Sequence, residues 1–261
     1  METVSSLLGQ EGGQLRFSME LNENAYSSGA HVAAGDRWLT LASIEDGGSY
    51  FEDYPEFELR AYPDVYDLDG DGNPDIVCGS SDGRLYFYRG LGYKSRLLTE
   101  EAAPLTDSEG RQLSVSGYSA PVVCDFDGDG EADILCGAQD GKVYLFRGLG
   151  ELTFEAGVVV ADTGIEGQVF PDWGDLNGDG VDDLVCGSNS GKLLVLYGTE
   201  SGLPESGFTE LSVFGVDGDW LCPRIYDING DGIQDLLLGT FDGYVAKLLN
   251  QASAALPLRA S

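Results

Sequence analysis

The feature that most constrains this chain is an acidic nine-residue loop that occurs four times, at residues 67–75, 125–133, 175–183 and 227–235. The loops recur at intervals of 50 to 58 residues, and each lies inside a longer shared pattern. Self-similarity at such a period is typical of proteins built from one supersecondary unit repeated along the chain. The fold is therefore expected to consist of repeated units, each carrying one acidic loop.

Each unit has the same sequence pattern around its loop. A proline lies four residues before the loop, and a short apolar run ending in glycine follows it, then a tight turn and a second apolar run. Short apolar runs bounded by Asp-Gly or Ser-Gly predict strands joined by hairpins, and their continuous hydrophobicity indicates burial on both faces. We name these strands A, B and C. A fourth strand is expected in places, near 152–160 and 208–214. Four antiparallel strands per repeat predict a β-propeller blade.

A weaker fifth copy precedes the first loop. Aligning Asp46 with Asp140 matches residues 39–43 to strand B and 49–51 to strand C, without the acidic loop. The last copy lacks an evident fourth strand, whereas residues 14–21 alternate cleanly between apolar and polar. A closed ring leaves no free sheet edge. We therefore expect an all-β propeller of five four-stranded blades in one domain, residues 14–250, between tails 1–13 and 251–261. The blades are expected near 28–61, 62–100, 119–160, 168–214 and 221–249, the last completed by 14–21.

The loops have the composition of oxygen-ligand metal sites. Positions 1, 3, 5 and 9 are Asp or Asn, and glycines at positions 4 and 6 allow the backbone to curl so that the side-chain oxygens converge. Hard oxygen ligands in a flexible loop favour Ca²⁺ over Zn²⁺ and Mg²⁺, and the backbone carbonyl at position 7 would add one ligand. Four Ca²⁺ ions are expected, one per loop. The candidate ligands are Asp67, Asp69, Asp71, Asn73 and Asp75; Asp125, Asp127, Asp129, Glu131 and Asp133; Asp175, Asn177, Asp179, Val181 and Asp183; and Asp227, Asn229, Asp231, Ile233 and Asp235.

The loops have two other possible interpretations. An EF-hand needs glutamate at position 12, and that position is Cys78, Cys136, Cys186 or Leu238, each within an apolar run. Alternatively, Asp-Gly clusters are simply hairpin turns. The same pattern in four copies weighs against turns alone.

These residues resemble a known family. The Asp-x-Asp/Asn-x-Asp-Gly-x-x-Asp loop between strands A and B, the preceding proline and the apolar segment ending in glycine are similar to the FG-GAP/VCBS repeats of integrin α-subunit propellers and many bacterial surface proteins. The resemblance covers about residues 62–249, with a degenerate extension back to residue 14, and it implies calcium binding. The chain departs from the family in its five expected blades, where most relatives have seven or eight. It also lacks the Phe-Gly half of the name motif, of which only residues 119–121 keep a trace.

The composition excludes some functions and bears on location. A formal charge of −31 would repel nucleic acids and anionic lipid surfaces. No apolar run is long enough to insert into a membrane. Calcium availability favours an extracellular or cell-surface protein, although the first residues lack the features of a secretory signal, which leaves a cytoplasmic alternative.

Five cysteines argue against a disulfide framework. Three of them share one repeat position with Leu238 and are expected in the core, and Cys124 and Cys222 are expected on buried A strands.

The remaining side chains leave the ligand open. No nucleophile elbow, Walker loop or zinc-protease motif occurs, and the single histidine, His31, has no clustered partner in sequence. Tyr26, Tyr118 and Trp220 could form a platform for a sugar ring or a partner's side chain, or could serve ordinary blade packing. Residues 100–119 form the least regular segment.

The leading expectation is a non-catalytic calcium-binding module for a glycan or an extracellular protein. The alternatives are the propeller of a polysaccharide-degrading enzyme, which could bring calcium to substrate carboxylates, and a structural, self-assembling module.

Overall fold

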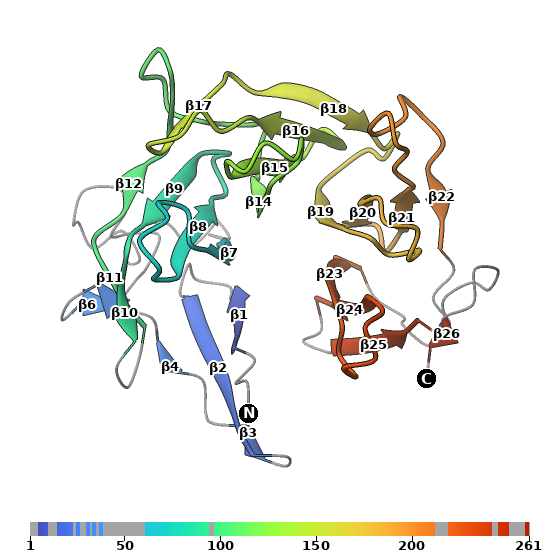
Figure 1. Cartoon of the computed structure of the whole chain (residues 1–261), viewed down its shortest axis with the longest axis horizontal. Helices are drawn as coiled ribbons and strands as arrows, with labels where there is room; N and C mark the ends of the chain where they lie inside the picture. Colours follow the sequence, from blue (N-terminus) through green and yellow to red (C-terminus); the bar gives the residue numbers. More distant parts are fainter. Residues whose placement is uncertain are drawn as a thin grey trace. The chain divides into compact units, whose positions relative to one another are not determined.

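The computed structural model describes residues 5–9, 15–22, 25–26, 30–31, 33–34, 37–38, 61–93, 97–211, 219–241, 245–250 and 259–260. Every regular element in these ranges is a β-strand (Figure 1). Within the same ranges there is no helix with the length and apolar character needed to cross a membrane. The predicted all-β class is confirmed.

Four sheets carry the acidic loops, and each follows the predicted order A, B, C and a fourth strand. In the first, third and fourth of them, every neighbouring pair runs antiparallel. Such four-stranded units are the blades of a β-propeller. The sheets consist of β7 (Tyr62–Tyr66), β8 (Asp75–Gly79), β9 (Leu85–Tyr88) and β12 (Ala103–Pro104); β14 (Ala120–Cys124), β15 (Asp133–Gly137), β16 (Lys142–Phe146) and β18 (Val158–Asp162); β19 (Val169–Gly174), β20 (Asp183–Ser188), β21 (Leu193–Leu196) and β22 (Thr209–Glu210); and β23 (Cys222–Tyr226), β24 (Asp235–Gly239), β25 (Val245–Leu249) and β26 (Arg259–Ala260).

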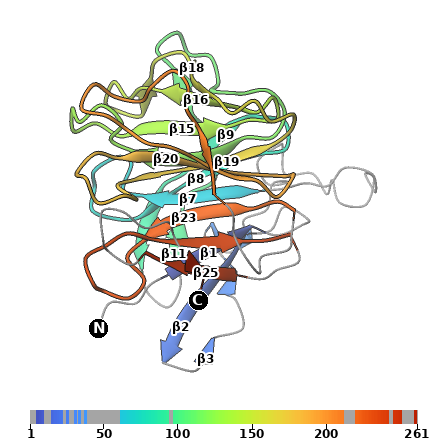
Figure 2. The same cartoon turned by 90° about the vertical axis from the view of Figure 1, so that its right-hand side faces the viewer.

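The chain divides into two compact units. One comprises residues 1–126, 130–134 and 146–157, and the other comprises 127–129, 135–145 and 158–261. In the first unit β7, β8 and β9 lie side by side (Figures 1 and 2), and every residue of β8 and β9 is buried. In the second unit every residue of β20 and β21 is buried, and a core cluster joins Val185 and Val195 to Leu236 and Leu248. The continuous apolar runs thus fill the core, as predicted.

Residues 100–119, predicted to be the least regular segment, pair and pack with the first blade. This segment contains the short strands β12 and β13 (Thr106–Asp107). Leu105 and Leu113 are buried, and the backbone N–H of Leu105 donates to the carbonyl of Leu85. β13 pairs in parallel with β17 (Thr153–Phe154). The fourth strand expected near 152–160 is therefore divided between β17 and the blade strand β18.

The predicted closure by the N-terminal strand is wrong. The fourth position of the last sheet is taken by β26, which pairs antiparallel with β25. Residues 14–21 instead fall in β2 (Leu15–Asn22), which pairs with β1 (Ser5–Gly9), β3 (Ala25–Tyr26) and β4 (Ala30–His31). Pairing with a strand a few residues away closes a short loop, which costs less chain entropy than pairing across the whole chain.

The fifth blade is not confirmed either. Of the region near 28–61, the structure describes β4, β5 (Ala33–Ala34) and β6 (Arg37–Trp38), and residues 39–60 lie outside the described residues. β5 pairs with β6 and with β11 (Leu97–Thr99), which pairs with β10 (Gly90–Tyr93). The described strands of this region therefore join sheets other than the expected blade, and the part of the chain that the structure describes contains four blades.

Candidate metal centre

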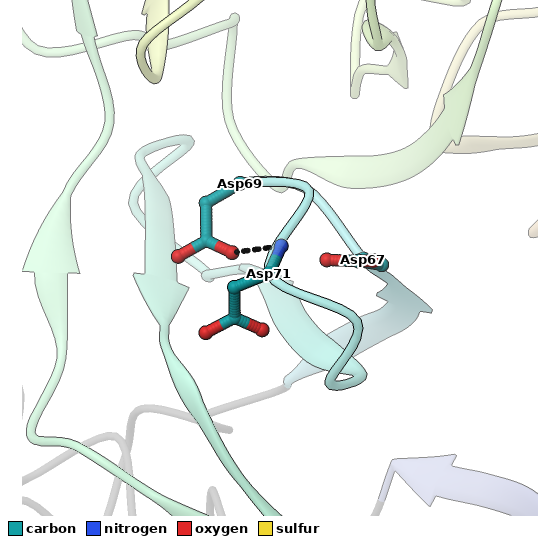
Figure 3. A group of neighbouring side chains, drawn as sticks. All are labelled: Asp67, Asp69 and Asp71. Carbon is teal, nitrogen blue, oxygen red and sulfur yellow. Dashed lines mark hydrogen bonds between the residues drawn. The ribbon is translucent and has the colours of Figure 1, made fainter.

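The first acidic loop brings three carboxylates together. The loop connects β7 to β8, and one oxygen each of Asp67, Asp69 and Asp71 lies within 4.8 Å of the others (Figure 3). Gly70 and Gly72 have φ of 71° and 86°, a backbone conformation that side chains with a Cβ rarely adopt. These two turns bend the loop so that alternate side chains face the same point, as the sequence predicts.

Hydrogen bonds within the loop fix the carboxylates in this arrangement. Asp67 Oδ2 accepts the backbone N–H of Gly72 at 2.9 Å, and Asp69 Oδ1 accepts that of Asp71 at 3.1 Å. Asp71 Oδ1 accepts the N–H of Asn73 at 2.8 Å. Each of these side chains thus accepts a hydrogen bond from a backbone N–H two to five residues later in the chain. These hydrogen bonds order the loop before any ligand is bound.

Two buried oxygens of the first loop, Asp67 Oδ1 and Asp69 Oδ2, have no hydrogen-bond partner among the described residues. Asp69 Oδ2 forms an ion pair with Arg89, 2.8 Å from its Nε, whereas Asp67 Oδ1 has no such pair among these residues. Leaving a charged oxygen buried and unpaired is unfavourable, so the site lacks a positive group at this point. A cation coordinated by Asp67 would supply that group. The donor set, carboxylate oxygens only, suits a hard ion such as Ca²⁺. The residues present therefore fit the predicted ion.

An arginine that the sequence reasoning missed also borders this loop. Arg89, at the end of β9, places Nε 2.8 Å from Asp69 Oδ2 and one terminal nitrogen 3.5 Å from Asp71 Oδ2. The side chain is about half exposed. The signal in the sequence was available, because Arg89 and Arg147 occupy the same repeat position in the first two blades.

The aspartate at position 9 ties each loop to the end of strand C. Asp75 Oδ2 accepts the N–H of Leu68 at 2.9 Å, and Asp75 Oδ1 accepts that of Gly90 at 2.6 Å. The bond to the residue fifteen positions ahead recurs in every loop, from Gly148 to Asp133, Gly198 to Asp183 and Asn250 to Asp235. All four aspartates are buried. Sequence reasoning gave position 9 a ligand role alone and missed this structural one.

Burial changes the acidity of these aspartates. The pKa of Asp75 and of Asp183 is raised from its ordinary value, above all because burial disfavours the charged form, although backbone N–H groups pull it down. Asp182, beside Asp183, also has a raised pKa, again chiefly through burial and then through the negative charge of Asp175. A nearby cation would favour the charged carboxylates and so offset both the burial and the repulsion from neighbouring carboxylates.

The four loops differ in how far their carboxylates converge. In the second loop, one oxygen each of Asp125, Asp127 and Asp133 lies within 4.8 Å of the others. Among the residues that the structure describes, these and the first-loop trio are the two such groups. The third and fourth loops keep the internal bonds of the first but carry asparagine at position 3. Position 7, at Asn73, Glu131, Val181 and Ile233, stays a predicted carbonyl ligand.

The predicted aromatic platform is not tested by these contacts. The ring of Trp220 lies 5.8 Å from that of Phe170 and 6.4 Å from that of Phe241, which gives it a packing role. Tyr118 is partly buried. Tyr26 belongs to β3, but its side chain, like that of His31 in β4, lies outside the described residues. The platform remains a prediction.

The cysteines behave mostly as the repeat positions indicated. Cys78, Cys136 and Cys186 are fully buried in strand B of their blades, and Cys124 and Cys222 are partly buried on A strands. All five are free thiols. The core role of the first three is confirmed, whereas the other two are less buried than expected.

Comparison with known families agrees with this geometry. The model of the FG-GAP-like repeat matches residues 67–136, 125–186 and 175–238. Each match runs from one acidic loop through strand B of the next, and together they cover more than half of the 261 residues. No curated protein gives a significant match. The chain belongs to the FG-GAP-like repeat family, and its four-stranded sheets are the blades of a propeller of that family.

Proposed function

We propose that this protein is a calcium-binding, non-catalytic propeller that displays a binding surface for a glycan or a protein outside the cytoplasm. The observation that carries the calcium assignment is the buried, unpartnered Oδ1 of Asp67, next to the converging oxygens of Asp69 and Asp71. Calcium bound only by the folded loops would add directly to the stability of the fold. Each loop would hold one ion through its aspartates and asparagine.

Several features support a non-catalytic role at these loops. The loop carboxylates already accept backbone N–H groups, so they are fixed as structural elements. Nucleophilic chemistry by a cysteine would need a reactive thiolate. The buried thiols of strand B are held in the core instead, and burial raises the pKa of Cys78 to about 12.

The proposed location follows from the ion. Extracellular calcium-binding modules work with modest affinity, and calcium outside the cell is abundant enough to fill such sites. The proposed ligand class follows from the family and from the charge of −31, which disfavours nucleic acid and anionic membranes.

Calcium titration of the metal-free protein tests the assignment. Isothermal titration calorimetry is expected to give about four ions per chain, and removal of calcium by EDTA is expected to lower Tm by about 5 °C or more. Asp67→Ala should lower the stoichiometry by one, whereas Glu109→Ala, which removes an exposed carboxylate outside the loops, should leave it unchanged. Equal melting curves in calcium and in EDTA would contradict the calcium assignment.

The ligand needs a separate experiment. Wild-type protein and Asp67→Ala are screened on a glycan array and against extracellular protein fractions, each with calcium and with EDTA. Specific retention in calcium that EDTA abolishes would support the binding role. Equal retention by both proteins in EDTA would argue against a calcium-dependent surface.

A further inference from the structure

Arg89 links two carboxylates of the first loop. Its guanidinium lies between Asp69 Oδ2, at 2.8 Å, and Asp71 Oδ2, at 3.5 Å, which are positions 3 and 5 of the loop. Two carboxylates on one loop repel each other, and a shared cation offsets that repulsion. The arginine therefore holds positions 3 and 5 together from outside the loop.

An asparagine makes the same link in the third and fourth loops. Asn177 Nδ2 donates to Asp179 Oδ2 at 2.9 Å, and Asn229 Nδ2 donates to Asp231 Oδ2 at 2.9 Å. In both loops the asparagine Oδ1 also accepts the N–H of position 5, as Asp69 Oδ1 does in the first loop. An asparagine at position 3 therefore both accepts the backbone N–H of position 5 and donates to the carboxylate of position 5. In the first loop these two contacts are divided between Asp69 and Arg89.

The sequence repeats this exchange in all four blades. Twenty residues after an aspartate at position 3 stands an arginine, Arg89 or Arg147, and twenty residues after an asparagine stands Tyr197 or Leu249. Counting positions 1, 3, 5 and 9 with this later residue, every loop has the same formal charge of −3. The extra carboxylate and the arginine occur together.

We propose that Arg89 is a resident counter-charge of the first loop, which keeps Asp69 and Asp71 in place without metal and lowers the loop's affinity for calcium. This inference rests on the proposed calcium binding. Removing a unit positive charge from the surroundings of a divalent ion is expected to tighten binding about tenfold, even with water-like screening. The first loop would then fill at higher calcium concentration than the same loop without its arginine.

A double-mutant cycle measures this effect in the first loop alone. The N–H of Gly72 donates to Asp67, and its NMR signal reports calcium at this loop, while Gly180 and Gly232 report the third and fourth loops. Calcium is titrated into wild type, Arg89→Gln, Asp69→Asn and the double variant. Arg89→Gln should lower the calcium Kd at Gly72 about tenfold and leave Gly180 and Gly232 unchanged. Asp69→Asn alone should weaken binding, and the double variant should return near wild type.

The metal-free stability supplies a readout that does not depend on calcium. In EDTA, Arg89→Gln should lower Tm by about 2 to 4 °C, and the added Asp69→Asn should restore it. Arg84→Gln is the matched control, since the Arg84 side chain is about as exposed as that of Arg89 and pairs with Asp82 outside the loop. If no glycine signal responds to calcium, the proposed calcium binding and the effect of Arg89 on affinity are both contradicted. The Tm values in EDTA then show by themselves whether Arg89 offsets the negative charge of Asp69. Unchanged Tm, or weaker calcium binding by Arg89→Gln, would overturn the inference.

The third loop allows the reverse experiment, which guards against misfolding of the first variant. Asn177→Asp should lower Tm in EDTA because it adds a carboxylate without a counter-charge. Adding Tyr197→Arg, twenty residues later, should restore Tm and reproduce the first-loop arrangement. Failure of Tyr197→Arg to restore any stability would contradict the pairing rule.

Discussion

A single residue can be both a ligand candidate and a structural tie, and position 9 of the acidic loops is the clearest case. Asp183 is buried and accepts backbone N–H groups from Leu176, Asn177 and Gly198 at 2.9 to 3.2 Å. The residue type was evident from the repeat. The hydrogen bond of this aspartate to the residue after strand C was not evident, because it depends on the three-dimensional path that brings the end of strand C back to the loop.

Asp183→Ala is expected to destabilise the metal-free protein, because it leaves three backbone N–H groups without an acceptor. The expected loss is about 2 to 4 kcal/mol of unfolding free energy, measured by urea denaturation in EDTA. Asp179→Ala is the control. This exposed side chain accepts from Val181 and Asn177, which water can also satisfy, so its loss in EDTA should be below about 1 kcal/mol. Equal losses would show that position 9 has no special structural role.

The buried thiols should be unreactive in the folded protein. Cys78 and Cys186 have a raised pKa because burial disfavours the thiolate, which is the reactive form. We expect a thiol reagent such as DTNB to leave Cys78, Cys136 and Cys186 unmodified in calcium and to label all five cysteines in denaturant. Peptide mapping after labelling checks this, and fast native labelling of Cys186 would contradict it.

At the scale of elements, local patterns predicted the strands but not all of their partners. The prolines, acidic loops and apolar runs placed strands A, B and C of four blades, and the structure confirms them. Residues 14–21 were assigned as the fourth strand of the last blade because they alternate cleanly, but alternation does not show which strand they pair with, and β26 takes that place. Turn glycines were recognised, whereas glycines needed for close packing were not.

Gly187, near the end of β20, is one of these packing glycines. A Cβ there would lie 2.0 Å from the carbonyl oxygen of Leu221, which belongs to the segment entering the last blade. Gly187→Ala should therefore push that backbone away and cost about 2 to 4 kcal/mol, measured by urea denaturation in calcium. Gly239→Ala, at the same position of the last blade, is the control, because its Cβ would meet nothing closer than 3.8 Å. Similar losses in both variants would contradict the packing explanation.

At the scale of the whole molecule, the charge of −31 makes protons and calcium alternative ways of neutralising the same carboxylates. Asp75 and Asp183 have a raised pKa in the folded state, so the folded protein binds their protons more tightly than the unfolded chain does. These two groups therefore contribute stability to the metal-free protein that increases as pH falls from the raised pKa toward the ordinary value of 3.8 and is lower above that window.

Calcium should reverse this trend, because it binds the ionised carboxylates and protons displace it. We expect Tm of protein stripped on a chelating resin to increase as pH is lowered from neutral toward the ordinary aspartate value of 3.8, and Tm in millimolar calcium to decrease over the same range. The two curves should converge at the acid end, where protonation removes the ligands. Circular dichroism melts at matched ionic strength measure both curves, since salt alone also screens the repulsion. Parallel slopes would mean that calcium and protons act at different groups, which would remove the loop carboxylates as the calcium site.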